Sequence, residues 1–264
     1  MRSRTVLPDL ISIVGLFLGF WAILLISQGR IVTACWMIVI AAIMDGLDGT
    51  IARLIRGTSV FGTEVDSLAD IVSFGVAPAV LIYAAVLEPY GILGVMFAFL
   101  PLLGGMLRLA RFNVMATSGA PRSKWFVGMP IPTSALLLAG FYLYMHGHTE
   151  VDADARIWFS LNLAVSLLMV SPIPYRKLPG TITKRDKRTW IPAIIVILAA
   201  SAMIWNPDFA LFPMMLIYML SGPVEWAIEH LRKGKLISGD ADSAETATTA
   251  PRRRAAKRPR RSER

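Results

Sequence analysis

The chain has 264 residues, of which 55% are hydrophobic and only 17% charged, against about 25% charged in an ordinary soluble domain. This composition excludes a disordered chain and a small disulfide-bonded scaffold, and the single cysteine, Cys35, excludes an internal disulfide. The net charge of +9 is concentrated in residues 252–264, whose own net charge of +7 leaves only +2 for the rest of the chain.

Eight apolar runs are candidates for membrane-spanning helices, of which the fifth, sixth and seventh are short. Such a helix needs about 20 mostly apolar residues, and its backbone is satisfied internally in lipid. The runs are too continuous for the strands of a membrane barrel, in which apolar and polar residues alternate. The sequence therefore predicts an all-α, polytopic integral membrane protein with about eight transmembrane helices. The runs are 9–28, 31–53, 66–87, 91–112, 132–146, 157–171, 190–205 and 208–228.

The basic residues predict the orientation of the chain in the membrane. With the N-terminus inside, 25 of the 27 Lys and Arg residues fall on the cytoplasmic side, and only Arg30 and Arg156 fall outside. We therefore expect both termini in the cytoplasm, with a transmembrane domain at 1–231 and a disordered polybasic tail at 232–264. The tail has no aromatic residue, which argues against nucleic-acid binding.

Two roles for this tail are equally consistent with its composition. Near anionic lipid each basic side chain contributes about 1 kcal/mol to membrane association. A tail that only fixes the topology and keeps the chain soluble has the same composition.

Four aspartates lie at the ends of two neighbouring apolar runs. Each would cost about 2.5–3.5 kcal/mol at the bilayer centre and less near the interface, so their charges need compensation. Asp45 and Asp48 are three residues apart and share a helix face, and Asp66 and Asp70, four apart, share a face of the next helix. The short connection makes these helices an antiparallel hairpin in which all four carboxylates meet at the cytoplasmic end. Such hard oxygen ligands suit Mg²⁺, Mn²⁺ or Ca²⁺.

Small residues and an arginine surround these aspartates. Gly46, Gly49 and Gly62 each destabilise a helix by about 1 kcal/mol relative to alanine. Their presence in predicted helices therefore needs an explanation. Close packing of membrane helices is one reason, and room for a ligand beside the backbone is the other. Ala52 lies on the aspartate face, and Arg53 has the geometry to hold a phosphate through paired hydrogen bonds. The whole set favours a site for metal and phosphate.

The spacing of these residues resembles the signature of the CDP-alcohol phosphatidyltransferase family. It reads Asp45-x2-Asp48-Gly49-x2-Ala52-Arg53-x8-Gly62-x3-Asp66-x3-Asp70 and matches the family pattern without a departure across 26 residues. The resemblance implies a membrane enzyme that transfers the phosphatidyl group of CDP-diacylglycerol to an alcohol and releases CMP. It implies a general base at Asp70 and two divalent cations, Mg²⁺ or Mn²⁺. The implied metal ligands are Asp45, Asp48, Asp66 and Asp70, and the implied CDP-diacylglycerol-binding residues are Gly49, Ala52, Arg53 and Gly62.

Further segments resemble the phosphatidylserine synthase branch of this family, in which the acceptor is L-serine. They are 67–79, 108–113, 126–132 and 168–175. One departure is Asp9, where the branch leads us to expect asparagine after Pro8. The resemblance also implies a homodimer in the inner membrane, with the active site on the cytoplasmic face.

The acceptor pocket is open to two interpretations. Arg108 and Arg111 are three residues apart at a cytoplasmic helix end, where they would bind the serine carboxylate, with Asn113 close by. The same arginines would also serve as simple interfacial anchors of the helix.

Three other functions remain open from the sequence. The same chemistry with glycerol 3-phosphate or inositol phosphate as acceptor would call for a denser basic pocket near Asp70. A cation transporter would use the four aspartates as an ion site, but a cluster at one membrane face, without paired broken helices, argues against it. A metal-bound scaffold without turnover is the third alternative.

Overall fold

The structure is a computed structural model that describes residues 6–55, 60–117, 125–148, 154–176 and 206–248. Within these ranges the chain is helical apart from one two-stranded ribbon and the connecting turns. Four helical segments of the described ranges are long and apolar enough to cross a membrane. The chain is therefore an all-α integral membrane protein, as the sequence predicts. The segments are Leu10–Ser27, Ile31–Ile51, Gly62–Met115 and Pro207–Leu231.

Seven of the eight predicted runs coincide with helices of the structure. The run at 190–205 lies outside the described residues. Helix α7 (Ala155–Val170) has only 16 residues, so it is shorter than the other spans. The number of eight spans and the cytoplasmic position of both termini stay predictions.

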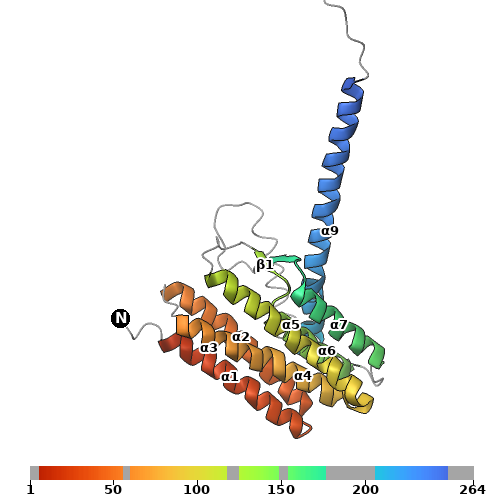
Figure 1. Cartoon of the computed structure of the whole chain (residues 1–264). Coiled ribbons are helices and arrows are strands. Elements are labelled where there is room, and N and C mark those ends of the chain that lie inside the picture. Colours follow the sequence, from red (N-terminus) through yellow and green to blue (C-terminus); the bar gives the residue numbers. More distant parts are fainter. Residues whose placement is uncertain (1–5, 56–59, 118–124, 149–153, 177–205, 249–264) are drawn as a thin grey trace, which may run out of the picture. The chain divides into compact units, whose positions relative to one another are not determined.

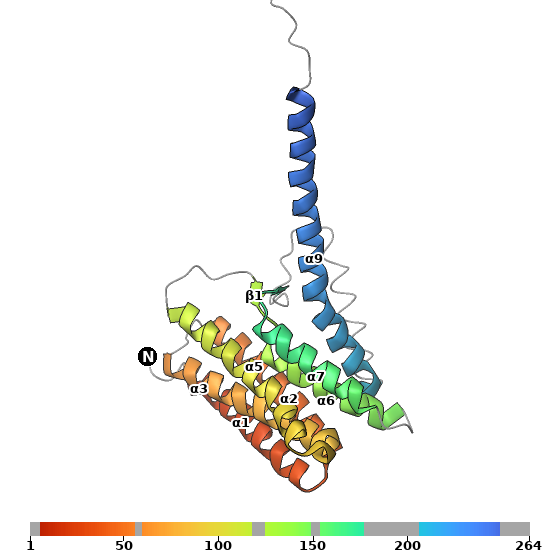
Figure 2. The same ribbon diagram turned by 45° about the vertical axis from the view of Figure 1, so that its right-hand side comes forward.

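The first two helices form an antiparallel pair. Helix α1 (Val6–Ser27) and helix α2 (Ile31–Ile55) lie side by side in both views (Figure 1 and Figure 2). The turn between them contains Gly29, whose φ of 76° lies in the left-handed region that favours glycine. The amide of Arg30 closes the turn by donating to the carbonyl of Leu25 at 2.9 Å. This reversal brings the second half of α2 beside the first half of α1.

A third helical run extends without a break to Leu87. It begins at Val60, earlier than the predicted run at 66–87, so that Asp66 lies inside a helix rather than at its start. The π-helical segment η2 follows directly after Asp70, and such wide turns are frequent at functional sites. The parts of the run are α3 (Val60–Asp70), η2 (Ile71–Val76), α4 (Ala77–Ile82) and η3 (Tyr83–Leu87), and the 3₁₀ turn η4 (Glu88–Tyr90) follows it.

Helix α5 (Gly91–Thr117) returns along the third run. The chain reverses at Gly91, whose φ of 56° is again left-handed. Helix α5 packs against η2 and α4, so its C-terminal half reaches the end of the bundle where α3 lies (Figure 1).

A buried asparagine repairs an interruption in α5. Pro101 lies inside this helix and has no N–H, so the carbonyl of Phe97, four residues earlier, loses its helical partner. The side-chain amide of Asn162 on α7 donates to that carbonyl. Asn162 is completely buried, so its hydrogen bond joins α5 to α7 in the interior of the bundle.

Helix α6 (Ile131–His148) occupies the centre of the bundle. Its buried side chains follow one another around the helix rather than along one stripe, as expected for a helix surrounded by others. It contacts α2, α4, α5 and α7. The buried residues of α6 include Ile131, Ala135, Leu137, Leu138, Phe141 and Leu143.

A short two-stranded ribbon contacts the last helix through Tyr175. Strands β1 (Trp125–Val127) and β2 (Pro174–Arg176) pair antiparallel, with Phe126 opposite Tyr175. The buried hydroxyl of Tyr175 donates to the carbonyl of Met219 at 3.0 Å, and burial raises the pKa of this hydroxyl, so it keeps its proton. Gly222 leaves the room that the Tyr175 ring occupies, because a Cβ there would collide with the ring.

The last described helix, α9 (Pro207–Thr248), belongs to two compact units, Met1–Pro223 and Val224–Arg264. In the second unit the rings of Trp226 and His230 contact each other at 4.4 Å, one helical turn apart. The helix continues through residues 232–248, where the sequence predicted a disordered tail. Residues 224–248 contain no proline that would end the helix, and residues 249–264 lie outside the described ranges.

Candidate active site

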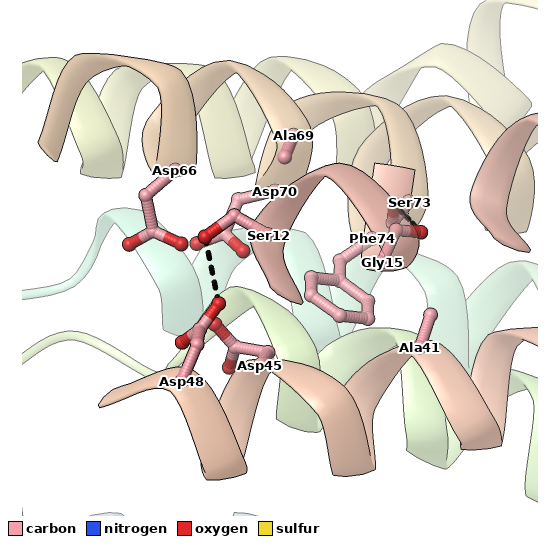
Figure 3. Close-up of a pocket in the computed structure, with 10 residues that line it drawn as sticks. All are labelled: Ser12, Gly15, Ala41, Asp45, Asp48, Asp66, Ala69, Asp70, Ser73 and Phe74. Atoms are coloured by element: carbon pink, nitrogen blue, oxygen red, sulfur yellow. Dashed lines mark hydrogen bonds between the residues drawn. The ribbon is translucent and has the colours of Figure 1, made fainter. Parts of the chain in front are cut away.

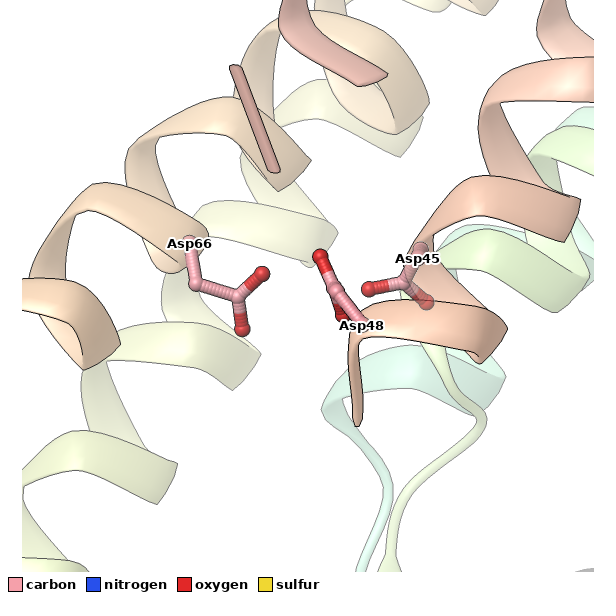
Figure 4. A group of neighbouring side chains, drawn as sticks. All are labelled: Asp45, Asp48 and Asp66. Carbon is pink, nitrogen blue, oxygen red and sulfur yellow. The ribbon is translucent and has the colours of Figure 1, made fainter. Parts of the chain in front are cut away.

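Three of the four signature aspartates converge between two neighbouring helices. Asp45 and Asp48 come from α2, and Asp66 comes from α3 (Figure 4). One carboxylate oxygen of each lies within 4.8 Å of the others. The spacing of three residues places the first two on one face of α2, and the antiparallel neighbour supplies the third.

Asp70 lines the same pocket and interacts electrostatically with Asp45 and Asp66, although it is not a member of the close group. It lies one turn after Asp66 on α3, immediately before the π-helical segment η2. The walls of the pocket come from α1, α2, α3 and η2 (Figure 3). The lining residues are Ser12, Gly15, Ala41, Asp45, Asp48, Asp66, Ala69, Asp70, Ser73 and Phe74.

Helix α1 contributes a hydrogen bond to the carboxylates. The hydroxyl of Ser12 donates to Oδ2 of Asp48 at 2.8 Å (Figure 3). Both side chains are buried, with 8% and 5% of their surfaces exposed. The sequence did not single out Ser12, because it lies 36 residues before Asp48 and outside the repeated aspartate spacing.

A buried arginine faces the carboxylates from α5. Arg108 interacts electrostatically with Asp70, with Asp45 and with the phenol of Tyr218 on α9. A buried cation beside buried carboxylates offsets part of their mutual repulsion. Arg108 was predicted as an acceptor-binding residue, whereas Tyr218 lies in a uniformly apolar stretch that gave no signal of a role.

The glycines of α2 face open space rather than a neighbouring helix. No described atom lies within 4 Å of the positions where a Cβ would stand on Gly46 and Gly49. Gly19 and Gly105 pack tightly by contrast, since a Cβ on Gly19 would collide with Ser73 and one on Gly105 with Ile131. Helix packing against described residues therefore does not explain the two glycines beside the aspartates.

The donor set of the close group matches a hard divalent cation. It consists of three carboxylates, and no His or Cys from the described part of the chain belongs to it. Oxygen-only donors select Mg²⁺, Mn²⁺ or Ca²⁺ over zinc. The residues present therefore fit the metal that the signature implies.

Comparison with known proteins agrees with this site. Residues 5–171 match the family model described as CDP-alcohol phosphatidyltransferase, which covers the four aspartates and more than half of the chain. The chain belongs to the CDP-alcohol phosphatidyltransferase family.

Three curated relatives illustrate the similarity within this family. A CDP-diacylglycerol–serine O-phosphatidyltransferase of Helicobacter pylori is 36% identical over 225 residues, which are 83% of this chain and 90% of the relative. One of the same name from Methanocaldococcus jannaschii is 34% identical over 86% of this chain and 96% of the relative. An archaetidylserine synthase of Methanothermobacter thermautotrophicus is 38% identical over 68% of this chain and 73% of the relative.

None of the three predicted acceptor residues of this phosphatidyltransferase is among the residues that line the pocket, and Arg111 and Asn113 bond to other groups. The guanidinium of Arg111 donates to the carbonyls of Val127 at 3.1 Å, Val170 at 3.3 Å and Ser171 at 3.5 Å, so it fastens β1 to the end of α7. Asn113 belongs to a polar group at the end of α5, where its amide donates to Ser67 at 3.2 Å and to Glu64 at 3.4 Å. Their role in acceptor binding stays a prediction.

The remaining predicted residues of the family signature lie on the same two helices. Gly62 is in α3, partly exposed, one turn before Asp66. Ala52 and Arg53 follow Asp48 along α2, but their side chains lie outside what the structure describes. Their predicted contacts with CDP-diacylglycerol therefore stay predictions.

Proposed function

We propose that this chain is a phosphatidylserine synthase, which transfers the phosphatidyl group of CDP-diacylglycerol to the hydroxyl of L-serine and releases CMP. Membership of the CDP-alcohol phosphatidyltransferase family supports the reaction class. The names of the relatives support the acceptor, because both the phosphatidyltransferases and the archaetidylserine synthase carry serine in their names.

The observation that carries this proposal is the convergence of aspartates from α2 and α3 around one pocket. A diphosphate cannot approach four bare carboxylates without cations between them. Asp45, Asp48 and Asp66 would hold a divalent ion, and Asp70 would stand near a second one. Bound Mg²⁺ or Mn²⁺ would neutralise the phosphate charge and stabilise the departing CMP.

Asp70 is the general base of the proposed reaction. Its carboxylate takes the proton of the serine hydroxyl, and the serine oxygen forms a bond to the phosphorus that carries diacylglycerol. The bond between this phosphorus and the oxygen of CMP breaks, and CMP leaves with the electron pair. Asp70 lines the pocket together with the three carboxylates of the close group but is not a member of that group, which supports this division of roles.

The two substrates approach from different sides of the carboxylates in this proposal. Gly49, with open space beside it, supports a place for CDP-diacylglycerol along α2, next to Ala52 and Arg53 and across from Gly62. Arg108, buried beside Asp70, is the strongest candidate to bind the carboxylate of serine. Arg111 and Asn113 would act at the rim of the same pocket.

We further propose that the protein is a homodimer of the inner membrane with its active site on the cytoplasmic face. The aspartates lie toward the opposite helix ends from the turns at 28–30 and 88–90. Arg108 and Arg111 share the aspartate end, which the concentration of basic residues would make cytoplasmic.

The test is CMP release by the purified protein in detergent with CDP-diacylglycerol and Mn²⁺. Serine, glycerol 3-phosphate and inositol phosphate are offered separately, and Asp70→Asn is the control. We expect release with serine alone and none from the variant. Release with another acceptor would keep the chemistry and overturn the serine assignment, and no release with any acceptor would overturn the proposed activity.

A further inference from the structure

Helix α1 supplies a hydroxyl hydrogen bond to a signature carboxylate. Ser12 donates to Asp48 at 2.8 Å. The Asp66 carboxylate on α3 lines the same pocket as Ser12 (Figure 3). A serine hydroxyl carries one proton, and in the structure Ser12 donates it to Asp48. Ser12 thus ties α1 to a carboxylate of the metal-binding group.

A second set of contacts fixes α1 so that Ser12 faces the carboxylates. The buried hydroxyl of Ser73, in the π-helical segment η2, donates to the carbonyl of Gly15 at 3.0 Å. One turn further along α1, Gly19 lies so close to Ser73 that a Cβ would collide with it. These contacts set the rotation and the depth of α1 against η2, and Ser12 lies about one turn before Gly15 on the same helix.

We propose that Ser12 is a positioning residue of the metal site, which orients Asp48 for the divalent cation. The inference rests on the proposed metal dependence. A carboxylate that is fixed by a hydrogen bond loses less rotational freedom when it binds a metal. Outer groups that orient metal ligands in this way change metal affinity by about 10–100-fold when they are removed.

The test compares variants of Ser12 with a matched buried serine elsewhere. Ser12→Ala removes the hydroxyl, and Ser12→Thr keeps it. Ser166→Ala is the control, because Ser166 is 7% exposed and donates to Asn162 of its own helix, far from the carboxylates in sequence and on another helix. Mn²⁺ binding is measured by isothermal titration calorimetry on the purified full chain without substrate, and thermal unfolding is followed for every variant.

We expect Ser12→Ala to bind Mn²⁺ about 10–100-fold more weakly, while Ser12→Thr and Ser166→Ala stay within about threefold of the wild type. The Mn²⁺ concentration for half-maximal CMP release shifts in parallel, whereas kcat at saturating Mn²⁺ changes less. A helix-packing role alone would lower the thermal midpoint without moving the Mn²⁺ affinity.

Two results overturn the inference, and they are distinguishable. If Ser12→Ala binds Mn²⁺ as tightly as the wild type, Ser12 does not position the ligands, and the proposed function is untouched. If the wild-type chain binds no Mn²⁺, the metal dependence of the proposed function fails, and this inference fails with it. Should Ser12→Ala not fold, Ser12→Cys keeps the volume with a weaker donor, and normal Mn²⁺ affinity in that variant overturns the inference equally.

Discussion

Asp48 and Asp70 lie in one pocket but in different surroundings. Asp48 is buried, accepts a hydrogen bond from Ser12 and belongs to the close group with Asp45 and Asp66. Asp70 lines the same pocket without belonging to this group, and its charge interacts with Asp45, Asp66 and Arg108. A ligand of the metal and a proton acceptor need these different surroundings, since the first is held by several groups and the second must reach the substrate hydroxyl.

Substitutions at these two positions therefore separate metal binding from turnover. We expect Asp48→Asn to abolish tight Mn²⁺ binding, because an amide is a weaker ligand than a carboxylate. Asp70→Asn should retain at least one bound Mn²⁺ while CMP release falls by about 10²-fold or more. Calorimetry and CMP release on the same preparations measure both effects. Near-normal turnover by Asp70→Asn would contradict its role as the base.

The open space beside Gly49 leads to a second prediction. Gly49→Ala should keep or raise the thermal midpoint, because alanine stabilises a helix by about 1 kcal/mol and meets no described atom. If CDP-diacylglycerol occupies that space, its KM should rise about tenfold with a smaller change in the KM for serine. Gly19→Ala is the matched control, since its Cβ collides with Ser73 and should lower the thermal midpoint instead. An unchanged KM in Gly49→Ala would argue against a substrate at this face.

At the scale of helices, two interruptions are tied to neighbouring elements. The π-helical segment η2 presents Ser73 to α1, and the gap left by Pro101 in α5 is filled by Asn162 from α7. In the bilayer core there is no water that could donate a hydrogen bond to a backbone carbonyl whose helical N–H partner is missing. Each interruption therefore also fixes the position of one helix against the next.

Removal of the Asn162 amide should destabilise the bundle without affecting the chemistry. Asn162→Leu leaves the carbonyl of Phe97 unpaired, which should reduce the free energy of unfolding by about 1–3 kcal/mol. Thermal unfolding in detergent measures the loss, and the KM values for both substrates should stay unchanged. Ser160→Ala, an exposed position on the same helix, is the control and should unfold like the wild type. Equal midpoints for the two variants would show that this hydrogen bond contributes little.

The spacing of residues in the sequence predicts the helices and most of the aspartate cluster, but it does not predict which residues of other helices contact that cluster. The helix runs and the convergence of Asp45, Asp48 and Asp66 are predictable, because the spacing of residues on a helix and a short connection place them on facing surfaces. Ser12 and Tyr218 were missed, since they reach the site from helices distant in the sequence. No local pattern indicates which turn of an apolar helix faces a neighbour.

The same limit applies to Arg111, whose sequence position predicts a substrate contact. In the structure its guanidinium donates to three backbone carbonyls at the junction of β1 and α7. A cationic side chain at a helix end has several potential partners, and only the folded chain decides among them. The sequence also did not predict that α9 continues to Thr248. The polar composition of 232–248 predicts a disordered tail, while the absence of proline allows a helix.

At the scale of the whole membrane domain, the helix directions divide the described chain into two ends. The turns at 28–30 and 88–90 mark one end, and the aspartates with Arg108 lie toward the other. The excess of basic residues predicts that the aspartate end faces the cytoplasm. This orientation would admit serine and release CMP on the side where both are soluble metabolites.

Cysteine labelling tests this orientation directly. The single native cysteine, Cys35, is buried, so Cys35→Ala gives a background without accessible thiols. In that background, we expect Gln28→Cys to react with a membrane-impermeant maleimide from outside intact cells. Thr63→Cys, exposed near the aspartates, should react only in inverted vesicles. Labelling of Thr63→Cys from outside would contradict a cytoplasmic active site. Labelling of both positions from the same side would contradict the assignment of the two ends of the helix bundle to opposite faces of the membrane.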